Sequence, residues 1–138
     1  MSKAILIVDD SEGDAELLKR LVGRAGVLNP IRVLFNGEDA MRYLEGEPPY
    51  SDRNKWPLPS VIILDLKMPG IHGFQFLEWC KAHAHCRETM LVILSGHGDT
   101  TTIRRGYALG AQSFLTKPCR ALDLENLIRA YPQYWQRE

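Results

Sequence analysis

Carboxylate, hydroxyl and ammonium side chains stand at the ends of short apolar runs in this sequence. These side chains belong to Asp9, Asp10, Asp65, Ser95 and Lys117. If the apolar runs are parallel strands of one sheet, their carboxyl ends lie at the edge where open α/β sheets bind ligands. Three carboxylates at one edge need a cation, because like charges raise one another's pKa. Mg²⁺ suits such a site, since it accepts a few carboxylates and completes its shell with water and phosphate oxygens.

An ammonium and a hydroxyl beside such a cation could surround a phosphoryl group on several sides. Asp65 would then be a nucleophile that forms an aspartyl phosphate. The alternative takes each acid by itself, as a helix cap or a loop acid, and the run from Asp9 to Glu12 also resembles the start of a helix. The phosphoryl interpretation is favoured because it explains all five residues together, whereas capping explains them one by one.

Apolar patterning alternates predicted strands with predicted helices along the chain. The strands are short apolar runs: Ala4–Val8, Ile31–Phe35, Val61–Leu64, Leu91–Leu94 and Ser113–Leu115. The helices are Asp14–Ala25, Glu38–Leu44, Phe74–Ala84, Thr101–Leu109 and Leu122–Ala130. This alternation predicts an α/β fold, a doubly wound five-stranded parallel sheet with helices on both faces. The length suits a single domain, residues 1–138, with a core from about Lys3 to Ala130.

Two segments stand outside this alternation. Glu45–Pro59 is a proline-rich connection that is long by usual loop standards, and it is either a tolerated surface insertion or a partner contact. The end of the chain, residues 131–138, carries three aromatic rings that either pack back on the core or anchor a dimer or partner, since aromatic residues are enriched at interfaces. These rings belong to Tyr131, Tyr134 and Trp135.

We expect the protein to form a homodimer. Besides the aromatic tail, a second candidate surface carries charges of both signs, which suit a two-fold contact of one patch with itself. Its residues are Arg104, Arg105, Tyr107, Asp123 and Glu125.

Composition narrows the classes of partner. Seventeen Lys and Arg balance seventeen Asp and Glu, so no basic surface for nucleic acid is expected. No apolar stretch approaches the roughly 18–20 residues that span a bilayer, so no membrane association is expected, and the N-terminal MSKAILIVDD is unlike a signal peptide. Three cysteines argue against a disulfide framework and favour the cytoplasm. Cys80–Cys86 holds two Cys and two His, but four zinc ligands cannot converge from one unbroken helix.

Four stretches together resemble the receiver domain of two-component response regulators, the CheY-like, flavodoxin-like fold. They are Ile5–Asp14 (ILIVDDSEGD), Val61–Gly73 (VIILDLKMPGIHG), Val92–Asp99 (VILSGHGD) and Gly110–Pro118 (GAQSFLTKP). The long connection Glu45–Pro59 further resembles the single-domain regulators that are paired with bacterial phytochrome-type sensor kinases.

The resemblance implies a role for each residue of the group. Asp65 is implied to be the phosphoacceptor. The implied Mg²⁺ ligands are Asp9, Asp10, Asp65 and the backbone carbonyl of Lys67. Lys117 is implied to pair with the phosphoryl group. The peptide bond between Lys117 and Pro118 is usually cis in this family. Ser95 and Phe114 take the positions of the conformational switch. Because Phe114 lacks the hydroxyl of a tyrosine, a readout there is expected to be steric.

The implied function is that of a single-domain response regulator. A sensor histidine kinase or phosphotransfer protein donates a phosphoryl group to Asp65 with Mg²⁺, and the switch passes the signal on. Such a chain is a phosphoacceptor and not an enzyme, apart from slow self-dephosphorylation. A phosphohydrolase would typically have a second acid two residues after the nucleophile, where this chain has Lys67. The alternative is a constitutive receiver-like interaction scaffold, which would usually lack an acid or the lysine.

Overall fold

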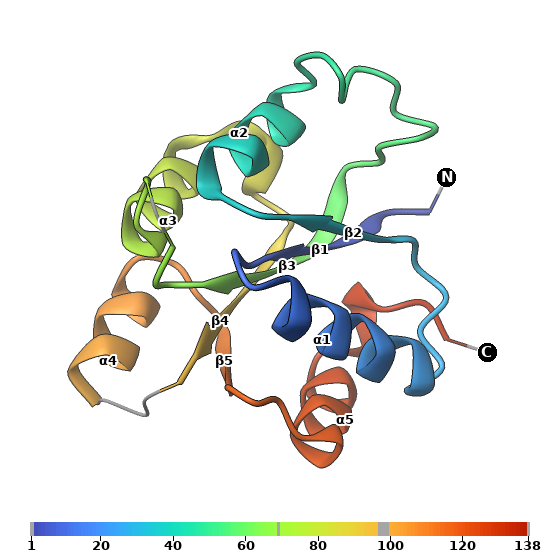
Figure 1. Ribbon diagram of the computed structural model, residues 1–138, viewed down its shortest axis with the longest axis vertical. Helices are drawn as coiled ribbons and strands as arrows, with labels where there is room; N and C mark the ends of the chain where they lie inside the picture. Colours follow the sequence, from blue (N-terminus) through green and yellow to red (C-terminus); the bar gives the residue numbers. More distant parts are fainter. Residues whose placement is uncertain (1, 69, 97–99, 138) are drawn as a thin grey trace.

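A parallel β-sheet forms the centre of the chain in the computed structural model, which describes residues 2–68, 70–96 and 100–137 (Figure 1). Within these residues the strand order is β2-β1-β3-β4-β5. The strands are β1 (Ala4–Val8), β2 (Ile31–Leu34), β3 (Pro59–Asp65), β4 (Met90–Ser95) and β5 (Ser113–Thr116). The helices are α1 (Glu12–Arg24), α2 (Gly37–Glu45), α3 (Gly73–Ala82), α4 (Thr100–Ala108) and α5 (Ala121–Ala130). The predicted fold is therefore confirmed.

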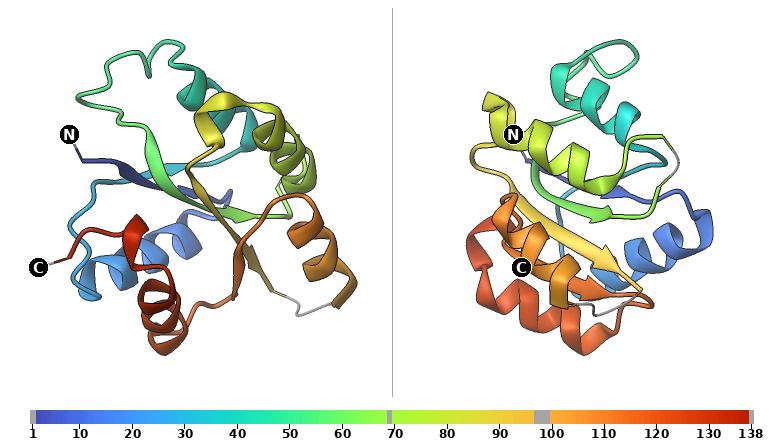
Figure 2. Two further views of the ribbon diagram at one scale, coloured as in Figure 1. Left: turned by 180° about the vertical axis from the view of Figure 1, so that it is seen from behind. Right: turned by 90° about the vertical axis from the view of Figure 1, so that its left-hand side faces the viewer.

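The helices cover both faces of the sheet. Alternate residues of β1 belong to two separate apolar clusters, because successive side chains of a strand point to opposite faces. Leu6 packs in the cluster under α2 and α3, and Ile7 packs in the cluster under α1 and α5. Figure 2 shows the two layers on either side of the sheet. Since both faces are covered, the central strands are apolar throughout, and polar groups gather at the strand ends.

The boundaries differ from the predicted ones at several elements. β3 begins at Pro59 instead of Val61 and includes Asp65, while α2 runs to Glu45, so the connection expected at Glu45–Pro59 is shorter at both ends. α3 ends at Ala82 instead of Ala84, because His83 adopts an extended backbone conformation. Its ring accepts the N–H of His85 at 3.4 Å and starts the 3-10 turn Ala84–Cys86.

Strand register brings the polar residues to one edge. Val8 pairs with Leu64 in the β1–β3 ladder, so Asp9 follows directly beside the end of β3. Asp65 pairs with Leu94 in the β3–β4 ladder, and Ser95 pairs with Thr116 in the β4–β5 ladder. The carboxyl ends of four neighbouring strands therefore present the candidate residues side by side.

Two glycines allow helices to approach the sheet near this edge. A Cβ atom on Gly73, at the start of α3, would lie 2.6 Å from the Cα of Leu66 and 3.2 Å from the carbonyl oxygen of Asp65. A Cβ atom on Gly106, the buried residue of α4, would overlap the side chain of Ile93 on β4. A larger residue at Gly73 would push α3 away from backbone, whereas one at Gly106 would require the end of the Ile93 side chain to move.

The connection between α2 and β3 folds onto α2 through its own aromatic cluster. Ring centroids of Tyr43, Tyr50 and Trp56 lie 5.3–6.0 Å apart. The Tyr43 hydroxyl donates to the carbonyl of Pro57 at 2.7 Å, and the guanidinium of Arg53 donates to the carbonyls of Tyr43 and Leu44 at 2.9 Å. These contacts hold the segment against α2 within its own chain.

The end of the chain packs against the connection between α1 and β2 (Figure 2, left). Trp135 is 6% exposed and belongs to the cluster under α1 and α5. The N–H of Leu28 donates to the carbonyl of Gln136 at 2.7 Å, and the N–H of Gln136 donates to the side chain of Asn29 at 2.7 Å. Of the two interpretations of the aromatic tail, the structure therefore supports packing on its own chain.

None of the helices in the described residues is long and apolar enough to cross a membrane.

Candidate functional site

Three carboxylates converge at the carboxyl edge of the sheet. Asp9 follows β1, Asp65 ends β3 and Asp10 is the next residue after Asp9. One carboxylate oxygen from each lies within 4.8 Å of the other two. Asp9 is fully buried and Asp65 is 5% exposed, whereas Asp10 is open to solvent. The predicted cluster is therefore present, with two acids held in place by the sheet and one reaching it from the surface.

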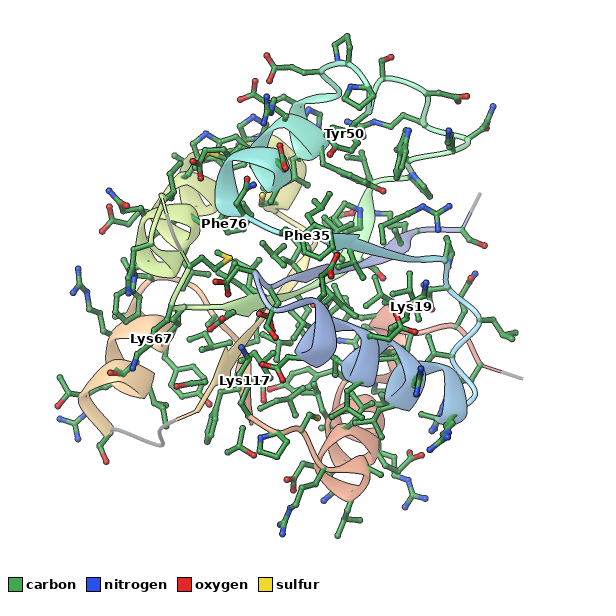
Figure 3. All side chains as sticks on the ribbon, in the orientation of Figure 1. Lys19, Phe35, Tyr50, Lys67, Phe76 and Lys117 are labelled. Carbon is green, nitrogen blue, oxygen red and sulfur yellow. The ribbon has the colours of Figure 1, made fainter. Side chains whose placement is uncertain are left out.

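Lys117 supplies positive charge to this cluster from the loop after β5. Its Nζ atom lies 3.0 Å from Asp65 Oδ2 and 3.0 Å from Asp9 Oδ2. The Lys117–Pro118 peptide bond is cis, as the resemblance implies. In Figure 3 Lys117 lies between α1 and the strand ends, while Lys67 lies near α4 and away from it. The two side chains therefore lie in different places, and it is the ammonium of Lys117 that contacts the acids.

Asp14 is a third carboxylate partner of Lys117 that the sequence analysis did not single out. It lies in the first turn of α1, and its Oδ2 is 3.3 Å from Nζ. The available signal was its place at the start of a predicted helix, a few residues after Asp9 and Asp10. An acid in a first helical turn is so often explained by the helix dipole that this signal alone identifies nothing.

Burial sets the electrostatics of the group. Burial raises the pKa of the Asp9 carboxyl, although the N–H of Ser11 and the ammonium of Lys117 act against it. Burial would lower the pKa of Lys117, but hydrogen bonds with Asp65 and Asp9 outweigh it and raise that pKa. The folded protein therefore keeps the lysine charged and resists ionisation of Asp9.

One buried oxygen in the group is left for a cation. Lys117 donates to Asp9 Oδ1 at 3.2 Å. Asp9 Oδ2 lies nearer to Nζ, at 3.0 Å, but accepts no hydrogen bond from the described residues because the direction is unfavourable. A buried polar atom without a partner is costly. The donor set, all carboxylate oxygens, is the kind that hard divalent cations bind, so the residues fit a metal ion.

Backbone groups hold the two buried acids in position. The N–H of Ser11 donates to Asp9 Oδ1 at 3.0 Å, and the N–H of Lys67 donates to Asp65 Oδ1 at 3.1 Å. Residue 67 is thereby kept beside the carboxylate of Asp65. The role expected for its carbonyl as a metal ligand stays a prediction.

A cavity of about 280 Å³ opens next to Asp65. Its lining includes Asp65, Lys67, His72, Phe74, Ser95 and Thr102. The structure thus brings Ser95 and Asp65 to one cavity. Phe114 lies elsewhere, half-buried on β5, where it lines a groove with α5. The motif residues Pro69, His97, Gly98 and Asp99 lie outside the described residues.

Among the described residues, the cysteines and histidines of Cys80–Cys86 form no comparable cluster. The ring of His83 stacks on Trp79 at 4.3 Å between centroids, and its Nδ1 accepts the N–H of His85. Cys80 and Cys86 are buried in the apolar core. Among the described residues, Asp9, Asp10 and Asp65 form the group of three whose ligand atoms meet.

Comparison with known proteins agrees with this geometry. The family model for the response regulator receiver domain matches residues 5–129. The chain is 34% identical over 125 residues to the two-component response regulator ARR17 of Arabidopsis thaliana, covering 89% of this chain and 80% of that protein. It is 26% identical over 133 residues to the response regulator Rcp1 of Synechocystis, covering 96% of this chain and 88% of that protein.

Solved structures of similar regulators have the same fold. The bacteriophytochrome response regulator RtBRR superposes with a TM-score of 0.87 at 28% identity, covering 100% of this chain and 82% of that chain. The Mn²⁺-bound form of Rcp1 superposes with a TM-score of 0.76 at 25% identity, covering 96% of this chain and 93% of that chain. The extent of the family match, together with the acidic group at the sheet edge, shows that this chain belongs to the response regulator receiver domain family.

Proposed function

We propose that the protein is a single-domain response regulator that accepts a phosphoryl group on Asp65 from a phosphohistidine. The observation that carries this proposal is the contact of Lys117 Nζ with Asp65 Oδ2 at 3.0 Å, beside a cavity that also contains Ser95. A nucleophilic carboxylate, a cationic partner and an open space for the transferred group thus meet at one point. The protein acts as a phosphoacceptor and not as an enzyme with turnover.

The transfer is a displacement at phosphorus. A carboxylate oxygen of Asp65 forms a bond to the phosphorus atom, and the bond from phosphorus to the donor's imidazole nitrogen breaks. The electron pair of that bond stays on the nitrogen. Asp9, Asp10, Asp65 and the carbonyl of Lys67 would hold Mg²⁺, which when bound supplies charge neutralisation for the phosphoryl oxygens. Lys117 donates a charge-assisted hydrogen bond to one of those oxygens.

The signal is a shift between two packings. Ser95 lines the cavity, and in the proposed mechanism its hydroxyl donates a hydrogen bond to a phosphoryl oxygen. The displacement of Ser95 makes room for the half-buried ring of Phe114 to turn inward. A phosphoryl group moves this equilibrium only by the interactions that it gains in one packing and lacks in the other. Lys117 and Ser95 provide those interactions.

The donor is a sensor histidine kinase or a phosphotransfer protein. The similarity to bacteriophytochrome response regulators, which extends over the whole chain in RtBRR, supports a phytochrome-type kinase as the source. The Mn²⁺-bound structure of Rcp1 supports a divalent cation, and we propose Mg²⁺.

Intact mass spectrometry after incubation with acetyl phosphate and Mg²⁺ tests the proposal. The expected result is a gain of one phosphoryl group that is absent in Asp65→Asn. Asp52→Asn, which removes an exposed acid in the α2–β3 connection, is the control and should gain the group normally. If the wild-type protein gains no phosphoryl group with Mg²⁺, or if Asp65→Asn gains it equally, the chain is a constitutive scaffold instead.

A further inference from the structure

Lys117 has three carboxylate neighbours, and the third has no part in the proposed transfer. Asp14 Oδ2 lies 3.3 Å from Nζ. The Asp14 side chain is 51% exposed, whereas those of Asp9 and Asp65 are 0% and 7% exposed. Asp14 is also outside the group of three carboxylates whose oxygens converge. It therefore contacts the lysine without belonging to the candidate metal site.

Asp14 approaches the lysine from the side of α1. Asp14 and Lys117 line a small hollow together with Leu17 and Pro118. Asp65 and Ser95 line the larger cavity, in which neither Asp14 nor Lys117 takes part. A phosphoryl group on Asp65 and the carboxylate of Asp14 would thus attract the same ammonium toward two different places.

The ammonium has three N–H donors. It donates hydrogen bonds to Asp65 Oδ2 at 3.0 Å and to Asp9 Oδ1 at 3.2 Å, and it forms an ion pair with Asp14 Oδ2 at 3.3 Å. A phosphoryl oxygen that binds the ammonium therefore competes with these three carboxylates for it. Leaving a buried acid without a partner is costly, whereas water readily replaces the partner of an exposed one. Asp14 is the exposed acid of the three, so it is the partner that gives way.

We propose that Asp14 is a positioning residue that competes with the phosphoryl group for Lys117 and thereby weakens the phosphorylated state. This inference rests on the proposed function and specifies how the resting state holds the lysine. The first turn of α1 acts as a restraint that the phosphoryl group must overcome.

The test compares the affinity of the protein for beryllofluoride, a phosphoryl mimic, at fixed Mg²⁺ and low salt. Asp14→Asn should bind the mimic about 1.4- to 5-fold more tightly, because exposed ion pairs contribute about 0.2–1 kcal/mol. Glu12→Gln is the matched control. It removes one negative charge from the same helical turn, and Glu12 has no ion pair with Lys117 in the described residues. The difference in beryllofluoride affinity between Asp14→Asn and Glu12→Gln should become smaller at high salt, because screening weakens the ion pair between Asp14 and Lys117.

A second measurement follows the lysine itself. The side-chain nitrogen resonance of Lys117 in the free protein should shift in Asp14→Asn, stay unchanged in Glu12→Gln and return in Asp14→Glu. In a Lys117→Met background, Asp14→Asn should have no more effect on mimic affinity than Glu12→Gln.

The inference is overturned if Asp14→Asn and Glu12→Gln bind the mimic alike, if the Lys117 resonance does not respond, or if the effect persists without the lysine. If the wild-type protein itself binds no mimic, the proposed function fails together with the inference. Failure of the inference alone leaves wild-type binding intact, so the two results are distinguishable.

Discussion

Asp9 is the most deeply buried of the acids at the sheet edge, because its side chain has no exposed surface. Burial raises the pKa of its carboxyl above the unfolded value. The folded state then holds the proton more tightly than the unfolded state, so this group removes stability as pH rises through the interval between the two pKa values. At neutral pH the ionised acid depends on compensation from Lys117, and a bound cation would add to it.

Asp10→Ala should abolish Mg²⁺ binding and phosphorylation of Asp65 together. Asp10 is exposed, so the substitution should change the free energy of unfolding in the absence of metal by no more than about 0.5 kcal/mol. In the wild-type protein, Mg²⁺ at a hundred times its Kd should raise that free energy by about 2.7 kcal/mol, and the variant should lose this gain. Urea unfolding with and without Mg²⁺ measures it, and full phosphorylation of the variant would refute the metal assignment.

The sequence predicted those candidate residues that lie at the carboxyl ends of strands. Asp65 and Ser95 follow apolar runs whose parallel pairing is the simplest arrangement for an alternating chain, and the sheet then brings them to one edge. Asp14 was missed, because its contact with Lys117 joins residues far apart in sequence and depends on how α1 leans over the sheet. Phe114 is on the predicted strand, but no pattern indicated that it would lie outside the cavity.

The helices and strands were predicted correctly as to type, whereas the residues at which they begin and end depend on single side chains. His72 and His83 act as caps of α3 and of the following 3-10 turn, through ring nitrogens that accept backbone N–H groups. Caps are expected from Ser, Thr, Asp and Asn, so two histidines gave no sequence signal. The extra residues of β3 come from tertiary pairing, in which Pro59 lies opposite Ala4.

Gly73→Ala should test how tightly α3 is seated beside the proposed phosphoacceptor. The added methyl group would meet the backbone of Leu66 at 2.6 Å, and backbone cannot move aside cheaply. We expect a loss of about 2–3 kcal/mol in the free energy of unfolding and slower phosphorylation of Asp65. Both are measurable, by urea unfolding and by the initial rate with acetyl phosphate.

Gly13→Ala provides the comparison for this substitution. Gly13 also lies in the first turn of a helix, but nothing lies within 4 Å of its added Cβ atom. Alanine in a helix is about 0.5–1 kcal/mol more favourable than glycine, so this variant should be slightly stabilised. Equal destabilisation of the two variants would show that close packing at Gly73 is not the cause.

Contacts between residues far apart in the sequence hold the C-terminal tail against the rest of the domain. Ser60 Oγ donates to the carbonyl of Tyr134 at 2.7 Å, and Arg137 forms an antiparallel bridge with Val27. Glu125 is bound by both Arg129 and Arg137, so one acid of the mixed-charge surface expected for a dimer already has partners within its own chain. A homodimer remains a prediction of the sequence, and the tail contacts make the helical face or the α2–β3 connection its candidate surfaces.

Trp135→Ala should show whether the tail is part of the fold. Loss of a buried indole near the chain end should lower the free energy of unfolding by about 3 kcal/mol, whereas Leu122→Ala, at a side chain that is 66% exposed, should change it little. Urea unfolding gives both values. Sedimentation velocity should give the same association state for wild type and variant. A variant that becomes monomeric while the wild type is dimeric, with unchanged monomer stability, would assign the tail to an interface.

Helix α4 rests on β4 through Gly106, its buried residue, and the remainder of its surface is partly or fully open to solvent. Little apolar area is hidden beneath it, so detaching this helix requires less free energy than unfolding the sheet and the other helices together. Its backbone amides should therefore exchange with deuterium through a local opening, at denaturant concentrations where those of β1 still report global unfolding. We therefore expect α4 to unfold locally, separately from the rest of the domain, next to the cavity in which the phosphoryl group would reside.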